Sequence, residues 1–331
     1  MHTLRLALLE VRERGGLHLP SGRRALAARV DDAVAKRLAG FSRLRASMTL
    51  FGRLLILVLS ILPKHAMSRV AGRLANLSVP RPLRPAVYRA FGRVFGAVLE
   101  DAELPLSEYA SINAFFTRQL KPGLRSIAPG ALVSPVDGTV GAYGPVAGDV
   151  LVQAKGRDYS LAALLGDDAL ARSMDGGTFA TLYLAPKDYH RIHVPADGEV
   201  VSATYIPGEL WPVNVHAVMH VADLFAVNER IVVTMRGQTG GTIAVVLVGA
   251  TMVGTTRVAF DDLHTNARRR EVQRRAYDPA IPVQSGGPLG HFEFGSTVIV
   301  VCSREAGAID PLAEGDTVRM GQRLGPIGPT G

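Results

Sequence analysis

From residue 121 onward the chain consists of short runs rich in Val, Ile, Thr and Tyr, separated by Gly, Pro and Asp. Runs of this kind between turn residues predict strands joined by short connections. The interrupting glycines and prolines argue against a doubly wound parallel sheet, and no glycine-rich nucleotide fingerprint follows a strand. We therefore expect a mainly antiparallel, barrel-like β domain. The predicted strands are Thr139–Tyr143, Val150–Ala154, Thr178–Leu184, Glu199–Ile206, Arg230–Met235, Thr242–Val248 and Ser296–Cys302.

The first 100 residues have a different character. They carry 18 Lys and Arg against 5 Asp and Glu, whereas the remainder of the chain is net acidic. A basic excess at one end suggests contact with an anionic partner, either nucleic acid or the phosphate groups of a membrane. Aromatic residues make up only 6% of the chain and do not alternate with the basic ones. This pattern disfavours nucleic acid and favours a membrane surface.

Helical apolar segments lie within this basic region. From Ser42 to about Asn76 the densest apolar run is Leu54–Leu62, which is 9 residues long, whereas a spanning helix needs about 20. A short apolar helix flanked by basic residues suits the membrane interface, and a buried core helix stays open as the alternative. A second helix is predicted at Pro85–Leu99, and after it Ser107 and Ser111 could each cap a short helix that leads to Phe116.

These patterns divide the chain into three parts. Residues 1–40 form a poorly defined extension, residues 41–100 a basic amphipathic helical region for membrane association, and residues 101–331 a β-rich domain. Together they predict an α+β protein. The single cysteine, Cys302, excludes an internal disulfide framework and a thiolate zinc cluster within one chain.

Four segments carry residues suited to chemistry, although each is weak by itself. Asp137 lies in a turn bounded by proline and glycine, and His190 and His193 are three residues apart between two prolines. Two histidines so spaced can serve metal binding or acid–base work. The other two segments are Tyr205–Leu210, followed by Asn228–Ile231, and Phe294–Val300.

In this order the four segments resemble the phosphatidylserine decarboxylases, enzymes with a self-made pyruvoyl group. The segments read PVDG, YHRIHVP, YIPGEL with NERI, and FGSTVIV, and the resemblance runs from about Met48 to Gly321. The chain has Phe294 where the bacterial family usually has leucine before Gly-Ser-Thr. Because this change precedes the scissile pair, we expect it to alter packing and to leave the chemistry intact.

The resemblance implies a self-cleaving enzyme. Ser296 would attack the carbonyl of Gly295, and elimination with loss of ammonia would leave a pyruvoyl group at the new N-terminus. That group provides the carbonyl electron sink that loss of carbon dioxide from phosphatidylserine requires. By match to the family motifs, His193 is the base, Asp137 orients it, and Ser296 is the nucleophile; His190 would serve decarboxylation, with a packing role as its alternative.

The same resemblance implies partners and a location. We expect phosphatidylserine as substrate, an anionic membrane surface as the docking partner, and no nucleic acid. The two cleavage fragments would remain together as a heterodimer, and a homo-oligomer stays open. The enzyme would be peripheral on the cytoplasmic face of the cell membrane. Five arginines are expected in a polar loop, where they could meet lipid phosphates, although a solvated loop is the explanation expected for most of them: Arg268, Arg269, Arg270, Arg274 and Arg275.

Two other classes of function remain as alternatives. A zinc-dependent hydrolase would use His190 and His193, although the sequence offers no obvious third ligand. A non-enzymatic β-barrel binding module docked at the membrane would keep Ser296 uncut.

Overall fold

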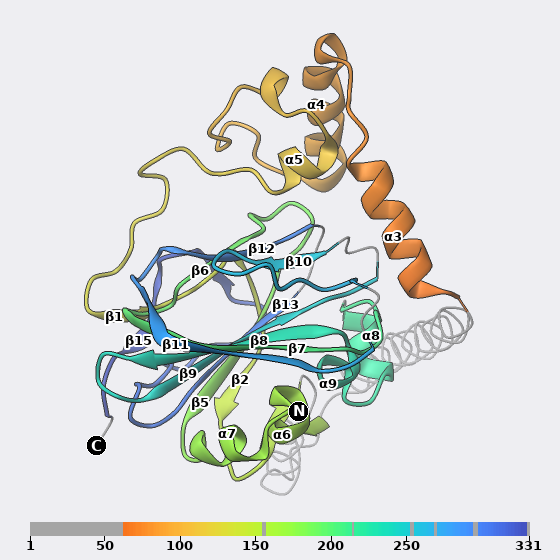
Figure 1. Ribbon diagram of the computed structural model, residues 1–331. Coiled ribbons are helices and arrows are strands. Elements are labelled where there is room, and N and C mark those ends of the chain that lie inside the picture. The colour runs from red at the N-terminus through yellow and green to blue at the C-terminus, as the bar shows by residue number, and fades with distance from the viewer. Residues whose placement is uncertain are drawn as a thin grey trace, which may run out of the picture. The chain divides into compact units, whose positions relative to one another are not determined.

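The central element of the fold is an eight-stranded sheet (Figure 1). The computed structural model describes residues 62–329, except 154–156, 214, 252–254, 268–269 and 294–296. The order across the sheet is β11-β7-β8-β9-β13-β5-β2-β14, and all neighbours are antiparallel. Its strands are β2 (Gly138–Pro145), β5 (Thr178–Tyr183), β7 (Gly198–Ile206), β8 (Arg230–Gly237), β9 (Thr242–Val248), β11 (Gln273–Val283), β13 (Thr297–Cys302) and β14 (Thr317–Val318).

The middle of the sheet is covered on both faces. Every residue of β13 is buried, and so is all of β9 except Thr242. Two-sided burial explains why these strands read as continuous runs of valine and isoleucine. Along β13, Val298 and Val300 belong to one apolar cluster, whereas Ile299 and Val301 belong to another. The sheet therefore separates two cores.

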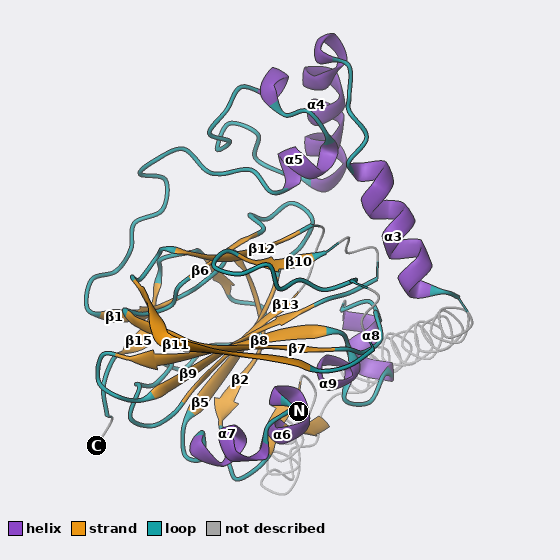
Figure 2. Cartoon of the chain, in the orientation of Figure 1, coloured by secondary structure: helices purple, strands orange, loops and turns teal. Residues whose placement is uncertain are grey.

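Different layers close the two cores (Figure 2). A small sheet of order β10-β12-β6 packs on the Val298 side and contributes Ile192, Leu289 and Phe292 to that cluster. Short helices pack on the Ile299 side. The small sheet comprises β6 (Arg191–His193), β10 (Thr256–Val258) and β12 (Pro288–Phe292), and the helices are α6 (Leu161–Leu165), α7 (Asp168–Ser173), α8 (Val215–His220) and α9 (Leu224–Val227).

Helices precede the sheet, as the sequence predicts. They are α3 (Lys64–Ala75), α4 (Arg84–Phe95) and α5 (Ile112–Phe116), with 3-10 turns η1 (Arg81–Leu83) and η2 (Leu106–Glu108). Tyr88, Tyr109 and Phe115 form a separate aromatic core among them. The side chain of Ser111 accepts a hydrogen bond from the backbone of Ala114 and caps α5, as predicted. The capping prediction for Ser107 is wrong, because this residue lies inside η2.

Two two-stranded ladders complete the described part of the chain. β1 (Ala131–Val133) pairs with β15 (Arg323–Pro326), and β3 (Val150–Gln153) pairs with β4 (Arg157–Ser160). The described residues all belong to one compact unit. Residues 1–61 lie outside the description; they include the extension and all of the apolar run Leu54–Leu62 except its last residue.

The α+β class and the mainly antiparallel sheet are confirmed, but the sheet is not a closed barrel. In the described chain its two outermost strands are β11 and β14, which do not pair with each other. β14 has only two residues, and β11 contains Pro279 and Pro282, which lack the N–H that a further strand would need. The loop prediction is also wrong for Arg274 and Arg275, which lie in β11 because their segment pairs with β7.

Candidate active site

Six strands of the large sheet begin or end along the same side of the sheet, and this row of strand ends is called the sheet edge below. β2, β8 and β13 begin there, whereas β5, β7 and β9 end there, because neighbouring strands are antiparallel. The cross-strand row at this edge is Thr139, Tyr183, Thr297, Val248, Arg230 and Ile206. The motif segments that follow or precede these strand ends therefore lie side by side, although more than 150 residues of the sequence separate the first segment from the last.

Gly295 and Ser296 lie outside the described residues, but the chain around them is described. Phe292 ends β12, and Thr297 begins β13 between β5 and β9. The hydroxyl of Thr297 is buried and has no hydrogen-bond partner among the described residues. A buried polar atom without a partner is costly, so this hydroxyl is available to a polar group at the start of β13. The surroundings therefore fit a carbonyl-bearing group formed from the preceding residue.

Asp137 is buried in the turn before β2, and both oxygens of its carboxylate have partners. Its Oδ1 accepts hydrogen bonds from the backbone N–H of Met320 at 2.8 Å and from Nε of Arg125 at 3.0 Å. Its Oδ2 pairs with Nη2 of Arg125. This hydrogen-bonded pairing with Asp137 raises the pKa of the Arg125 guanidinium. Arg125 and the N–H of Met320 thus hold the carboxylate in a fixed orientation, and neither partner is a histidine.

His193 ends β6 close to the Asp137 turn, since its N–H donates to the carbonyl of Pro135 at 2.9 Å. Its Nδ1 lies 2.7 Å from the carbonyl oxygen of Gly286, and its Nε2 lies 3.0 Å from the hydroxyl of Tyr189. A carbonyl can only accept, so Nδ1 carries the proton and Nε2 holds the lone pair. Burial lowers the pKa of His193, an effect that the hydrogen bond to the Gly286 carbonyl and, to a smaller extent, the charge of Asp137 partly oppose. A neutral imidazole can act as a base, and in this structure the Nε2 lone pair accepts a hydrogen bond from the Tyr189 hydroxyl.

Asp137 and His193 are therefore brought together, but no hydrogen bond joins them in the described structure. His193 Nδ1 contacts the carbonyl oxygen of Gly286, so this backbone group, and not the Asp137 carboxylate, orients the ring.

His190 is completely buried. Its ring stacks on Phe116 of α5 with centroids 4.0 Å apart, and its Nε2 donates to the carbonyl of Ala185 at 3.0 Å. Burial lowers its pKa to about 3, so the ring is neutral at physiological pH. His190 thus links α5 to the segment that leaves β5, and its only proton is already used in a hydrogen bond.

Three further residues at this edge were not singled out from the sequence. Arg125 and Tyr189 contact Asp137 and His193 as described, and Asp188 accepts a hydrogen bond from the N–H of Ala185 at 2.8 Å. Burial raises the pKa of Asp188, and the neighbouring negative charge of Asp137 adds to this effect. Asp188 and Tyr189 lie directly before the two histidines, so their position in that motif was an available signal. Arg125 offered none, because it lies in an irregular segment.

Nothing in the described structure supports a zinc centre. No group of three or more His, Cys, Asp or Glu side chains there could hold a metal ion. His190 and His193 point their ring nitrogens at different partners, as described above.

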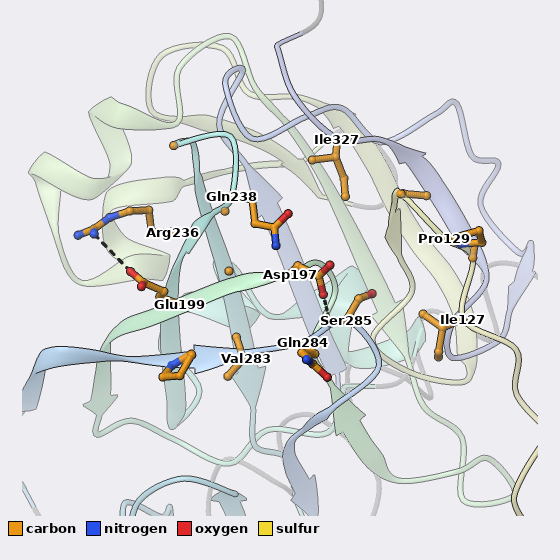
Figure 3. A pocket seen from close by; sticks show the side chains of 17 residues that line it. Ile127, Pro129, Asp197, Glu199, Arg236, Gln238, Val283, Gln284, Ser285 and Ile327 are labelled. Carbon is orange, nitrogen blue, oxygen red and sulfur yellow. Dashed lines mark hydrogen bonds and ion pairs between the residues drawn. The ribbon is translucent and has the colours of Figure 1, made fainter.

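Cavities lie at both ends of the sheet. One of about 310 Å³ is lined by His193, Tyr189 and Arg125. A larger one, of about 1020 Å³, lies at the opposite end beside Gly198 and Gly237. There an Arg236–Glu199 ion pair and a hydrogen bond from the Ser285 N–H to Asp197 are the marked contacts (Figure 3). The described lining of the larger cavity does not include His193, although it includes Ser285, which directly precedes Gly286, the residue whose carbonyl contacts His193 Nδ1.

Comparisons with known proteins agree with this geometry. Residues 112–326 match the family model described as phosphatidylserine decarboxylase. The chain is 49% identical over 278 residues to a phosphatidylserine decarboxylase proenzyme of Anaeromyxobacter sp. (strain K), covering 82% of this chain and 98% of that protein. It is 43% identical over 273 residues to the proenzyme of Myxococcus xanthus (strain DK1622), covering 82% and 97%. This chain therefore belongs to the phosphatidylserine decarboxylase family.

Proposed function

We propose that this chain is a phosphatidylserine decarboxylase proenzyme that cuts itself between Gly295 and Ser296 and then converts phosphatidylserine to phosphatidylethanolamine and carbon dioxide. The observation that carries the proposal is the convergence of the Asp137 turn, His193 and the entry to β13 at one sheet edge. Family membership supports the same reaction.

In the self-cleavage step, His193 takes the proton of the Ser296 hydroxyl at Nε2, where the Tyr189 hydroxyl lies in the described state. The serine oxygen forms a bond to the Gly295 carbonyl carbon as the peptide C–N bond breaks, which leaves an ester. Elimination then releases Gly295 as a carboxylate, and hydrolysis releases the nitrogen as ammonia. Burial raises the pKa of Tyr189 to about 12, so this hydroxyl keeps its proton and does not compete as a base.

The product of this step is a pyruvoyl group at position 296, next to the buried hydroxyl of Thr297. Its carbonyl supplies the electron sink that decarboxylation needs. We assign to Thr297 a hydrogen bond to a polar oxygen at the start of β13. Arg125 and Met320 hold the Asp137 carboxylate in place beside His193.

We assign His190 a positioning role. With a pKa of about 3 and an Nε2–H bonded to Ala185, it is a poor source of a proton for the carbanion. It fixes the Ala185–His193 segment against Phe116 instead. A direct part of His190 in decarboxylation is the alternative to this assignment.

The two fragments should remain associated after cleavage. The short fragment contains β13, which is hydrogen-bonded to β5 and β9 of the long fragment over its full length. Separation would expose the fully buried Val298, Ile299 and Val300, so the heterodimer is held by the core of the sheet. A homo-oligomer stays a prediction.

Peripheral membrane association has support from the described helices. Within residues 62–329, apart from the gaps, no helix has the length and apolarity needed to cross a membrane. Most exposed large apolar side chains of the described chain lie between residues 62 and 104. We define the membrane-docking surface as Val70, Leu74, Leu77, Leu83, Val94, Phe95 and Val98. Helices α3 and α4 also carry basic residues, namely Arg69, Arg73, Arg89 and Arg93. Apolar and basic side chains together suit an anionic membrane interface.

The location on the cytoplasmic face and the domain boundaries 1–40, 41–100 and 101–331 remain proposals.

Polar substitution of this surface should weaken membrane binding. Val70 and Leu74 are 52% and 61% exposed on α3. Burying these side chains in lipid contributes about 2 kcal/mol together, so Val70→Ser with Leu74→Ser should weaken vesicle binding roughly thirtyfold. Co-sedimentation with vesicles containing anionic lipid measures this. The matched control is Val272→Ser, since Val272 is 50% exposed near β11. Equal binding by the double variant and the control would remove this surface from the proposal.

The function itself is tested on the purified full chain. Intact-mass analysis should find residues 1–295 and a second fragment comprising 296–331, whose mass fits a pyruvoyl group in place of serine. The same material should release carbon dioxide from phosphatidylserine. An uncut chain with no decarboxylase activity would count against the proposal.

A further inference from the structure

The carbonyl that orients His193 belongs to a tight turn between β11 and β12, which we call the 284–287 turn. Within it, the N–H of Gly287 donates to the carbonyl of Gln284 at 2.9 Å. Gly286 has a φ of +77°, and a Cβ at this position would lie 2.6 Å from Cδ1 of Ile127. Glycine adopts this backbone conformation without a steric penalty. The turn is therefore suited to present a backbone carbonyl to the histidine.

Backbone hydrogen bonds attach the 284–287 turn to the residue that follows His193. The N–H of Gly286 donates to the carbonyl of Val194 at 2.8 Å, and the N–H of Val194 donates to the carbonyl of Gly287 at 2.8 Å. His193 Nδ1 adds its own contact with the Gly286 carbonyl at 2.7 Å. These bonds hold Gly286 and Gly287, and a different contact holds the preceding residue, Ser285.

That contact comes from the side chain of Asp197. Its Oδ1 accepts a hydrogen bond from the N–H of Ser285 at 2.7 Å (Figure 3). Asp197 lies directly before β7, and its own carbonyl accepts from the N–H of Gln238, in the loop between β8 and β9, at 3.3 Å. The carboxylate is thus fixed to the large sheet. Because the Gly286 carbonyl follows Ser285 directly in the chain, a shift of Ser285 would also move this carbonyl.

The position of the Gly286 carbonyl decides which nitrogen of His193 can act as a base. A neutral imidazole has one N–H and one lone pair. The acceptor at Nδ1 keeps the proton there and leaves the lone pair at Nε2, whereas the other tautomer has no lone pair at Nε2 for the proton of Ser296. No described hydrogen bond from Asp137 would restore the ring orientation if the carbonyl moved. A small displacement of the 284–287 turn should therefore slow the reaction.

We propose that Asp197 is a positioning residue for self-cleavage. Its carboxylate holds Ser285, keeps the Gly286 carbonyl on Nδ1 of His193, and so keeps the lone pair of the base at Nε2. The proposal rests on the proposed function for the role of His193 as the base. It gives Asp197 the orienting task that the sequence motifs assign to Asp137.

The first test follows self-cleavage of the full-length proenzyme, made by cell-free translation, on denaturing gels. Asp197→Ala removes the acceptor and should slow cleavage about tenfold to a hundredfold, the usual result of misplacing a catalytic group by about 1 Å. Asp197→Asn keeps an acceptor oxygen and should cut within about threefold of the wild-type rate. The matched control is Glu199→Ala. Glu199 lines the same cavity but pairs with Arg236, so its loss should leave the rate unchanged.

A second control separates positioning from loss of stability. Gly240 lies in the loop between β8 and β9 and has a φ of +89°, and a Cβ there would meet no described atom within 4 Å. Gly240→Ala strains this backbone without touching the 284–287 turn. It should lower the temperature of unfolding and leave the cleavage rate unchanged below that temperature. A Gly240→Ala rate as low as that of Asp197→Ala would assign the effect to stability and overturn the proposal.

The second test observes the tautomer of His193 directly and needs no cleavage. Full-length Ser296→Ala protein, which should stay uncut, is labelled with ¹⁵N-histidine, and the His193 signals are identified by their absence after His193→Ala. NMR should show a protonated Nδ1 in this protein and after adding Asp197→Asn. Adding Asp197→Ala should give a mixture of the two tautomers. An unchanged protonated Nδ1 after Asp197→Ala would overturn the proposal.

The outcomes separate this inference from the proposed function. An uncut wild-type chain would reject the proposed function, whereas the tautomer comparison would still test Asp197. Equal cleavage rates in the wild-type and Asp197→Ala chains would overturn the inference and leave the proposed function standing. If Asp197→Ala does not fold, Asp197→Asn still decides, because a cleavage rate about tenfold or more below wild type would contradict a role based on the acceptor oxygen.

Discussion

Replacing Ser296 with alanine should leave a single polypeptide of 331 residues with no decarboxylase activity. Alanine has no hydroxyl, so no ester can form at Gly295 and no carbonyl group can arise at the new N-terminus. Intact-mass analysis measures the first effect, and carbon dioxide release from phosphatidylserine measures the second. The expected loss is complete, because the reaction depends on a group that only this side chain supplies.

A matched control for this variant is Ser303→Ala. Ser303 follows the other end of β13 and accepts a hydrogen bond from the N–H of Thr242, so its loss affects packing of the same strand without touching the scissile bond. This control should be cut and active. Decarboxylation by an uncut Ser296→Ala chain would falsify the mechanism, whereas cleavage in Ser296→Ala at the normal position would assign the nucleophile elsewhere.

The strands at the centre of the sheet are readable from sequence because they are buried on both faces. β9 and β13 are almost entirely apolar, and turn residues bound them. β11 is not readable in this way. It is an edge strand with arginines and two prolines, and its burial pattern is largely exposed or intermediate. Charge and proline content favoured a loop, and only pairing with β7 makes the segment a strand.

The motif residues of the site were predictable, but their partners were not. Asp137 and His193 follow from recognisable motifs, yet Asp137 pairs with Arg125 from an irregular segment. His193 is oriented by the carbonyl of Gly286, which is 93 residues away in the sequence. A backbone carbonyl has no side-chain signature, so no sequence pattern reveals such a contact. Tertiary packing also leaves the buried Oε2 atom of Glu229 without a hydrogen-bond partner among the described residues, and no sequence pattern reveals this.

Replacing His193 with alanine should slow self-cleavage by about a hundredfold or more, the usual contribution of a general base. The structure also predicts the pH dependence. The base works only as neutral imidazole, and burial lowers the pKa of His193 below its ordinary value of 6.5. Cleavage by the wild-type chain should therefore fall to half of its maximal rate only at a pH below 6.5, where half of the rings are protonated. Proenzyme made by cell-free translation and followed on denaturing gels at several pH values provides the measurement.

His190→Asn is the matched control for the base, because asparagine retains an N–H donor for the carbonyl of Ala185, which His190 contacts through Nε2. The wild-type ring at this position is neutral throughout the tested range, since its pKa is about 3. This variant should therefore cut within a few-fold of the wild-type rate and keep the same pH profile. If His193→Ala cut normally while His190→Asn stalled, the base would be His190, and the lone pair at its unpartnered Nδ1 would be the group involved.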